Sequence, residues 1–192
     1  MIGGSFNAAT RYDYWSFNLL DSGEAIYPRM LVSSNAVTSA SQRLRLIYFR
    51  ARRSGTVTGI RSISGGTAAG ATPSLCKIGV YTVDPDTYAA TLAAATANDT
   101  SLWSAANTEY AVALASSLTT AAGSLYAWAT LCVTTAATPT LTGQAGPAGM
   151  AATSVRGTPV AGFVDGQTDL PSTIALASLT GSGNAPYGEL VP

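Results

Sequence analysis

Histidine is absent from this 192-residue chain. Without an imidazole, the chain has no Ser-His-Asp or Cys-His nucleophile system, no histidine-ligated zinc or iron, and no imidazole proton transfer. Its two cysteines are too few for a four-thiolate zinc site. We therefore expect no catalytic residues, no bound metal and no cofactor.

Charge is also scarce, because charged residues make up 10% of the chain against about 25% in a typical soluble protein. Ten basic and ten acidic side chains cancel at pH 7, and Lys77 is the single lysine. That balance does not suit a nucleic-acid coat. Hydrophobic residue types reach 47%, which is ample for a core.

Targeting and membrane segments are not expected. The N-terminal string MIGGSFNAATRYDYW lacks the basic flank and apolar stretch of a signal peptide. The uncharged run from Leu125 to Ala137 is rich in threonine and too short to cross about 30 Å of hydrocarbon. It predicts a buried strand, and we expect no membrane insertion.

Residues 1–40 differ from the rest of the chain in their aromatic content and lack of regular period. Aromatic side chains bury large areas at interfaces for little loss of entropy. We therefore predict an extended N-terminal arm over 1–40 that anchors the protein to another subunit through Phe6, Tyr12, Tyr14, Trp15, Phe17 and Tyr27.

From residue 41 to 192, short β-type runs recur between turns built from glycine, proline, asparagine and aspartate. This spacing is typical of a sandwich or jelly roll. We expect strands over Arg43–Arg52, Thr56–Ile63, Leu75–Val83, Leu125–Thr134, Val160–Val164, Ile174–Leu179 and Tyr187–Val191. The predicted fold is an all-β antiparallel β-sandwich (jelly-roll-like), preceded by the arm.

Two alanine-rich segments, Tyr88–Ala97 and Thr108–Ser117, fit a helix as well as a strand. Their threonines, and the Asp-Pro-Asp turn before the first, favour strands. The glycine-rich string at 65–70 lacks the lysine and spacing of a phosphate loop, and we interpret it as a flexible connection.

Three patterns resemble catalytic or metal sites. Ser74 and Lys77 have the S-x-x-K spacing of serine acyl enzymes, but on a strand they point to opposite faces. Asp84 and Asp86 resemble a glycosidase pair, yet they flank a proline in an evident turn. A calcium site built from oxygen ligands stays open as an alternative to simple turns, with the candidates Asp84, Asp86, Asn98 and Asp99.

Cys76 and Cys132 both fall in predicted strands. They form either a disulfide or, as in most proteins made inside cells, two small buried hydrophobic side chains.

The positive charge is concentrated in a stretch without acidic residues, between Glu24 and Asp84. One interpretation is a basic patch that grips an anionic polymer. The other, which we favour, is that the alternating arginines lie on the solvent face of a strand or pair with acids of a neighbouring subunit such as Asp165 or Asp169. The residues concerned are Arg43, Arg45, Arg50, Arg52, Arg53 and Arg61.

Three aromatic residues lie near loops that carry asparagine or aspartate, where an exposed ring can stack on a sugar. They are the candidate glycan-binding residues: Trp103, Tyr110 and Tyr88. Trp128 and Tyr126 lie inside an apolar run and are expected in the core.

Several longer strings carry a family resemblance. They are RLRLIYFRA, SISGGTAAGATPSLCKIGVYTVD, TANDTSLWSAANTEY, AGSLYAWATLCVTTAATPTLTG and LPSTIALASLTGSGNAPYGELVP. Together, and in this order, they resemble a β-sandwich module of minor tail and tail-fibre proteins from tailed phages that infect actinobacteria. The resemblance covers about residues 40–192.

The resemblance implies a non-enzymatic virion structural protein that is assembled in the host cytoplasm. Its partners would be other tail or capsid proteins, and its sandwich would contact host-envelope glycans or stabilise the particle. Because the domain is nearly the whole chain, capsid decoration or a head fibre on the major capsid protein is an alternative, and a free carbohydrate-binding module is another. We expect a homo-oligomer, with a trimer as the first candidate.

Overall fold

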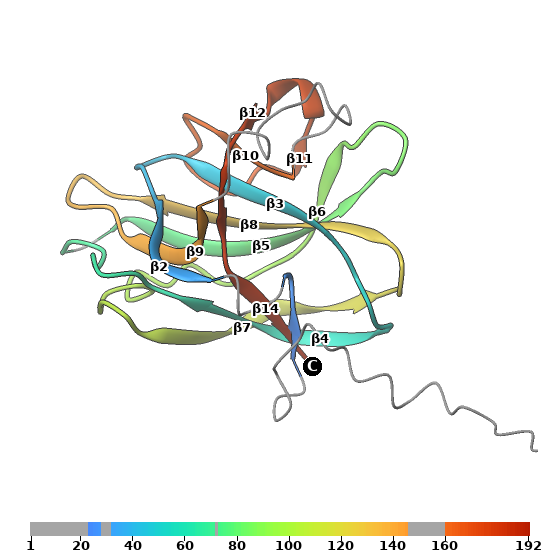
Figure 1. Cartoon of the computed structure of the whole chain (residues 1–192), viewed down its shortest axis with the longest axis horizontal. Helices are drawn as coiled ribbons and strands as arrows, with labels where there is room; N and C mark the ends of the chain where they lie inside the picture. The colour runs from blue at the N-terminus through green and yellow to red at the C-terminus, as the bar shows by residue number, and fades with distance from the viewer. Residues whose placement is uncertain (1–22, 28–31, 72, 146–159) are drawn as a thin grey trace, which may run out of the picture.

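The computed structural model describes residues 23–27, 32–71, 73–145 and 160–192 (Figure 1). Within these ranges the chain is almost entirely β-structure, without an α-helix, and the strand pairs are antiparallel. The sheets curl into a sandwich-like arrangement, so the predicted all-β antiparallel sandwich is confirmed.

One layer is a seven-stranded sheet. Its strands, in spatial order, are β11 (Thr173–Ile174), β6 (Ala90–Ala95), β5 (Leu75–Val83), β8 (Leu125–Val133), β3 (Leu44–Arg50), β10 (Ala161–Val164) and β12 (Thr180–Gly181). The central strands β5, β8 and β3 are each rich in large apolar, β-branched or aromatic residues, which suit a buried strand.

The facing layer contains two smaller sheets. A four-stranded sheet has the order β1 (Glu24–Ala25), β14 (Gly188–Val191), β4 (Gly55–Ile63) and β7 (Glu109–Thr120). A three-stranded sheet has the order β13 (Asn184–Pro186), β9 (Thr140–Ala145) and β2 (Ser33–Thr38). The two adjoin, because β13 leads into β14 and a bridge joins Ser64 to Leu141.

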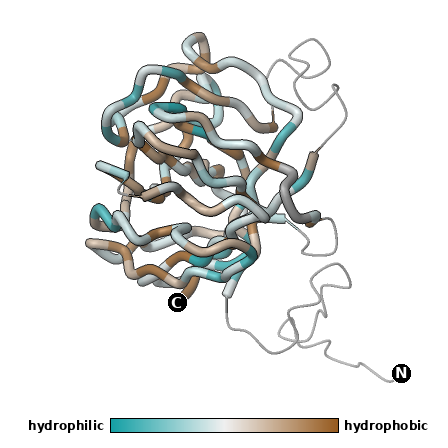
Figure 2. Tube along the Cα trace, turned by 90° about the vertical axis from the view of Figure 1, so that its left-hand side faces the viewer, coloured by the Kyte–Doolittle hydropathy of each residue, from teal (hydrophilic) through white to brown (hydrophobic). Residues whose placement is uncertain are grey.

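The main core lies between the layers and follows the strand alternation. Cys76, Ile78 and Val80 of β5 point into it, as do Trp128 of β8 and Ile60 of β4. Much of the trace is pale in Figure 2, since alanine, glycine, serine and threonine have intermediate hydropathy. Small side chains thus fill many of the positions around a few large buried ones.

A second apolar cluster covers the outer face of the seven-stranded sheet. It includes Leu44, Leu46, Tyr81 and Leu131, with Leu170 and Leu179 packed against it. The segment after β10, which contains a short 3₁₀ helix η4 (Leu176–Ser178), lies over this face. The central part of the sheet is therefore buried on both sides.

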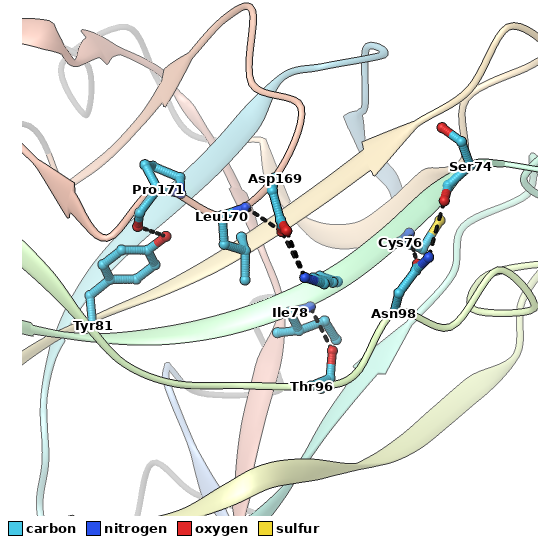
Figure 3. Close-up of polar contacts among 10 residues, drawn as sticks. Ser74, Cys76, Ile78, Tyr81, Thr96, Asn98, Asp169, Leu170 and Pro171 are labelled. Atoms are coloured by element: carbon cyan, nitrogen blue, oxygen red, sulfur yellow. Dashed lines mark hydrogen bonds and ion pairs between the residues drawn. The ribbon is translucent and has the colours of Figure 1, made fainter.

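Contacts between this segment and β5 are drawn in Figure 3. The Tyr81 hydroxyl donates to the carbonyl of Pro171 at 3.1 Å, and the Lys77 ammonium lies 2.8 Å from a carboxylate oxygen of Asp169. Gly79 permits the close approach, because a Cβ there would lie 2.9 Å from Leu170 Cδ1.

Most predicted strands are present, including the two ambiguous alanine-rich ones, β6 and β7. The strand predicted over Ile174–Leu179 is wrong, because only Ile174 is in a strand and 176–178 form η4. The apolar residues of this segment cover the outer face of the seven-stranded sheet and do not form a further strand of it.

The predicted boundary of the arm at residue 40 is also wrong. β1 pairs with β14, and β2 pairs with β9, so residues 24–25 and 33–38 belong to the sandwich. Phe6, Tyr12, Tyr14, Trp15 and Phe17 lie outside the described residues. No helix in the described ranges is long and apolar enough to cross a membrane.

Candidate functional site

The loops of the sandwich gather at two opposite ends. We call one the loop end; it contains the connections 39–43, 64–71, 96–108 and 134–139, at the left of Figure 1. The turns 51–54, 84–89 and 121–124 lie at the other end, which we call the terminal end.

Both described chain ends border the terminal end. The Arg53 guanidinium donates to the carbonyl of Gly23 at 2.8 Å, and the backbone N–H of Arg52 donates to Glu24 Oε1 at 2.6 Å. Arg53 and Pro192 also line the same small cleft. Gly23 and Pro192 are therefore both held beside the turn 51–54, away from the loop end.

Backbone hydrogen bonds tie the loops of the loop end to one another. Ala69 N–H donates to Trp103 O at 2.8 Å, Gly70 N–H to Ala137 O at 2.7 Å, and Asn107 N–H to Gly65 O at 2.8 Å. The string 65–70 is thus anchored to two neighbouring loops, contrary to the flexible connection that we predicted from its glycines.

Ser64 joins the network with its side chain. Its hydroxyl donates to Ala105 O at 2.6 Å and accepts from Thr108 N–H at 2.9 Å. Thr140 contributes in the same way, because its hydroxyl accepts from Thr67 N–H at 2.9 Å. Sequence reasoning missed both residues; the signal available was a hydroxyl residue beside each glycine- or proline-containing turn.

Unusual backbone conformations also occur at the loop end. Gln42, Trp103 and Asn107 have φ values of 61°, 63° and 52°, whereas among the described residues of the terminal end Tyr88, at 56°, is the one such residue other than glycine. Left-handed conformations of residues other than glycine cost on the order of 1 kcal/mol each and persist where the surroundings enforce them, often at functional sites. The loop end is therefore the candidate functional surface.

Most of the exposed side chains of this surface are small and uncharged, although the partly exposed Arg43 and Asp99 also lie in its loops. The small uncharged ones include Thr67, Ser104, Ala106, Asn107 and Thr135. Such a surface exerts little electrostatic attraction on a distant partner, and it offers shape, backbone groups and short polar side chains for contact. The chemistry available there is recognition by hydrogen bonds.

The prediction that Trp103 stacks on a sugar is wrong. Its side chain is 1% exposed, and its indole N–H donates to the Ser62 hydroxyl at 2.9 Å. The residue lies in a loop, but its ring packs into the main core, so neither face is open to a ligand.

The other two candidate aromatics do not join it in one site. Tyr110 is half-buried at the start of β7, and its hydroxyl accepts from Ala105 N–H at 2.7 Å, within the loop end. Tyr88 belongs to the terminal end and packs against the outer apolar cluster. A three-ring platform of Trp103, Tyr110 and Tyr88 is therefore not formed.

The predicted basic patch is not formed as one surface either. Arg43 pairs with Asp165 of the same chain at 2.6 Å, and Arg61 lies between Glu109 at 3.7 Å and Glu189 at 3.6 Å. Asp165 and Asp169, which we expected to pair across subunits, thus have partners within their own chain.

The remaining arginines are held by backbone carbonyls. Arg50 donates to Gly123 O, Arg52 to Ala25 O and Arg53 to Gly23 O. Arg45 is only 6% exposed and donates to Thr38 O. Burial, reinforced by the nearby Arg43 charge, lowers the pKa of the Arg45 guanidinium to about 10.

Tyr27, one of the predicted anchor residues, packs against its own sandwich. Its hydroxyl donates to Ala185 O at 2.8 Å, and its ring meets that of Tyr187 edge-on at 5.7 Å. It is therefore committed to the fold.

The patterns that resemble catalytic or calcium sites are accounted for by local contacts. Ser74 donates to Val133 O, whereas Lys77 pairs with Asp169. The Asp84 carboxylate accepts from the N–H groups of Asp86 and Thr87, and those bonds lower its pKa. Asp99 accepts from Ser101 at the loop end, so the four proposed calcium ligands lie at opposite ends of the sandwich.

By fold, the described part of this protein belongs to the class of all-β antiparallel sandwiches. Hydrogen-bonded loops form a surface at one end of it, and Gly23 and Pro192 lie at the other. Comparison of the sequence with models of known protein families and with curated proteins finds no match.

Proposed function

We propose that this protein is a non-enzymatic structural component of a bacteriophage virion, of the minor tail or tail-fibre type, that displays its sandwich on the particle surface. The observation that carries the proposal is the separation of the two ends. Gly23 and Pro192 border the terminal end, and the tied loops form the opposite one.

This arrangement suits a protein that is attached at one end and exposed at the other. A segment before Gly23 begins at the terminal end, so an anchor there leaves the loop end free to face outward. The family resemblance of the strings between residues 40 and 192 points in the same direction.

The rigidity of the loop end also supports a display role. Loops that are hydrogen-bonded to each other before contact lose little further entropy when a partner binds. Small neutral side chains limit non-specific adhesion by charge. A contact with host-envelope glycans would use these loops, with Tyr110 as the candidate aromatic there that is only half-buried.

Immunogold electron microscopy of virions tests the proposal. Antibody raised against the purified chain should label tails or tail tips of particles that incorporate it. Labelling of heads would replace the tail role with capsid decoration. Particles that lack the chain, together with reproducible glycan binding by the free protein, would replace both with a carbohydrate-binding module.

The expected self-association is tested on the same material. Light scattering of the purified full chain should give the mass of a trimer. A protein that is monomeric in solution and multimeric only in particles would indicate that its virion partner imposes the symmetry.

A further inference from the structure

The two cysteines, Cys76 of β5 and Cys132 of β8, are directly opposite each other on adjacent central strands. The Cys76 N–H donates to Asn98 Oδ1 at 2.9 Å, and the Cys76 carbonyl accepts from Asp99 N–H at 3.1 Å. The Cys132 carbonyl accepts from Gln42 N–H on its other side. Their backbone groups therefore point away from each other, so this is a non-hydrogen-bonded antiparallel pair.

This type of pair brings side chains closest together. Its Cα atoms are about 4.5 Å apart, which lies inside the range of about 4.4–6.8 Å spanned by disulfides. Here the two sulfur atoms are already 3.1 Å apart. A shift of about 1 Å would bring them to bonding distance.

The surroundings hold the pair in this position. The Asn98 side chain caps the start of β5, because its amide donates to Ser74 O at 3.0 Å while its oxygen accepts from Cys76 N–H (Figure 3). Cys76 is 0% exposed and Cys132 is 3% exposed. Both thiols lie on the face of the sheet that points into the main core.

We propose that Cys76 and Cys132 are a thiol pair that closes to a cross-strand disulfide when the protein meets a hydroperoxide, and that the bond joins β5 to β8. This inference goes beyond the proposed virion role and does not depend on it. The chain would fold with two thiols in a reducing cytosol and acquire the bond in an oxidising medium.

The chemistry balances with one hydroperoxide. A cysteine thiolate attacks a peroxide oxygen, which breaks the O–O bond and gives a sulfenic acid and one water after protonation. The second thiolate then attacks that sulfur and displaces hydroxide, which takes up a proton as the second water. Two thiols are oxidised by two electrons, and hydrogen peroxide is reduced to two waters.

Burial makes the reaction slow and dependent on pH. The hydrogen bond to Cys132, together with desolvation, raises the pKa of Cys76. Because the thiolate is the nucleophile, closure should accelerate as the pH rises from 7 to 9.

The test uses the purified full chain, reduced and freed of reductant, with hydrogen peroxide as the probe at pH 7 and pH 9. Titration in denaturant should find both thiols before treatment and neither afterwards. The intact mass should fall by two hydrogens, and a peptide that links Cys76 to Cys132 should appear. The oxidised chain should remain monomer-sized on a non-reducing gel and should melt about 5–15 °C higher than the reduced chain.

Cys76→Ala and Cys132→Ala are matched controls, since each leaves one thiol and should gain no thermal stability from peroxide. If either fails to fold, the comparison rests on the wild-type chain before and after re-reduction. The proposal would be overturned if both thiols remained after peroxide treatment of the folded chain but formed a disulfide when the chain was treated in denaturant. A bond between two chains, or an unchanged or lower melting temperature, would overturn it as well.

Discussion

At the scale of single residues, two buried side chains can be tested by substitution: Trp128, which packs closely against the backbone, and Arg45, which is charged. Trp128 lies at the centre of the main core with 0% exposure. A Cβ on Gly188 would be 2.5 Å from its indole ring. Glycine at 188 is thus required by the close approach of β14 to β8, and any side chain there would displace the tryptophan.

The Gly188→Ala variant should accordingly be destabilised by about 1–3 kcal/mol, as is typical when a methyl group overfills a core. Gly55→Ala is the matched control, because no atom lies within 4 Å of a Cβ at this position of β4. Urea unfolding monitored by tryptophan fluorescence measures both. Equal midpoints for the two variants would contradict the packing argument.

Arg45 is the second case, a charged group in an otherwise apolar position. Its Nη2 bonds Thr38 O, while its buried Nε has no hydrogen-bond partner among the described residues. Its pKa of about 10 lies below the ordinary value of 12.5. Folding therefore disfavours the charged form, and the cost is fully present below about pH 10 and declines above it.

Arg45→Met should then stabilise the fold at pH 7 by about 1 kcal/mol, because a buried charge without full pairing is replaced by an apolar chain of similar length. The advantage should shrink as the pH rises through 10. Denaturant unfolding at pH 7 and above pH 10 provides the measurement. Arg50→Met, at an exposed site on the same strand, is the control. A loss of stability at pH 7 would show that the bond to Thr38 outweighs desolvation.

At the scale of elements, the strands rich in apolar or β-branched residues were predicted, whereas β2 and β9, which have few large apolar residues, were missed. β5 and β8 are rich in apolar and β-branched residues, and both were predicted within one residue. β9 has Leu141 as its one large apolar residue and was missed. Its place in the sheet is decided by its pairing with β2 and β13, which local sequence does not encode.

The candidate site was harder to predict for a related reason. Trp103 follows Asn98, Asp99 and Ser101 in a polar loop, which suggested an exposed ring. Its burial depends on Ser62 of β4, 41 residues away in sequence. The loop-end network likewise consists of bonds between segments far apart in the chain, and neither periodicity nor composition reports such contacts.

The segment that covers the outer face of the seven-stranded sheet is fastened by two carboxylates. Asp165 accepts from Arg43, and this bond lowers the pKa of Asp165. Burial acts to raise the pKa of Asp169, but the bonds from Lys77 and Leu170 N–H outweigh it, so that its pKa is also lowered. Lowered carboxyl pKa values stabilise the folded state above the unfolded pKa and cease to do so as the pH falls through the folded one.

Hydrogen-exchange protection of residues 165–181 should consequently fall on acidification below about pH 4, after correction for intrinsic exchange, while β5 and β8 keep theirs. The double variant Asp165→Asn, Asp169→Asn should have the acid level of protection already at pH 7. Asp84→Asn is the control, because its carboxylate bonds only its own turn at the terminal end. An acid-induced loss that persists in the double variant would point to other groups.

At the scale of the whole molecule, the described ends of the chain are built into the sandwich side by side. Glu24 is opposite Leu190, and Leu190 is 2% exposed in the main core. Val37 of β2 is 0% exposed in the same core. The cooperative unit therefore begins by residue 24, well before the boundary at 40 that composition suggested.

Two truncations distinguish residues that serve as an anchor from residues that the sandwich needs in order to fold. Removing residues 1–22 leaves every described strand in place, and under the proposed anchor role the shortened chain should retain the β-type far-ultraviolet spectrum and melt within a few degrees of the full chain. Under the proposed function it should also fail to join particles. Removing residues 1–38 deletes β1 and β2 together with Val37, and should lower the melting temperature sharply or prevent folding.

Val37→Ala in the full chain provides the point control for the second truncation. It should cost about 2 kcal/mol through lost burial and a residual cavity, without affecting attachment to particles. If the chain that lacks 1–38 melted like the full protein, β1 and β2 would be dispensable additions to an independent sandwich. If the chain that lacks 1–22 still joined particles fully, attachment would have to come from the sandwich itself, and the terminal end would no longer be the attached one.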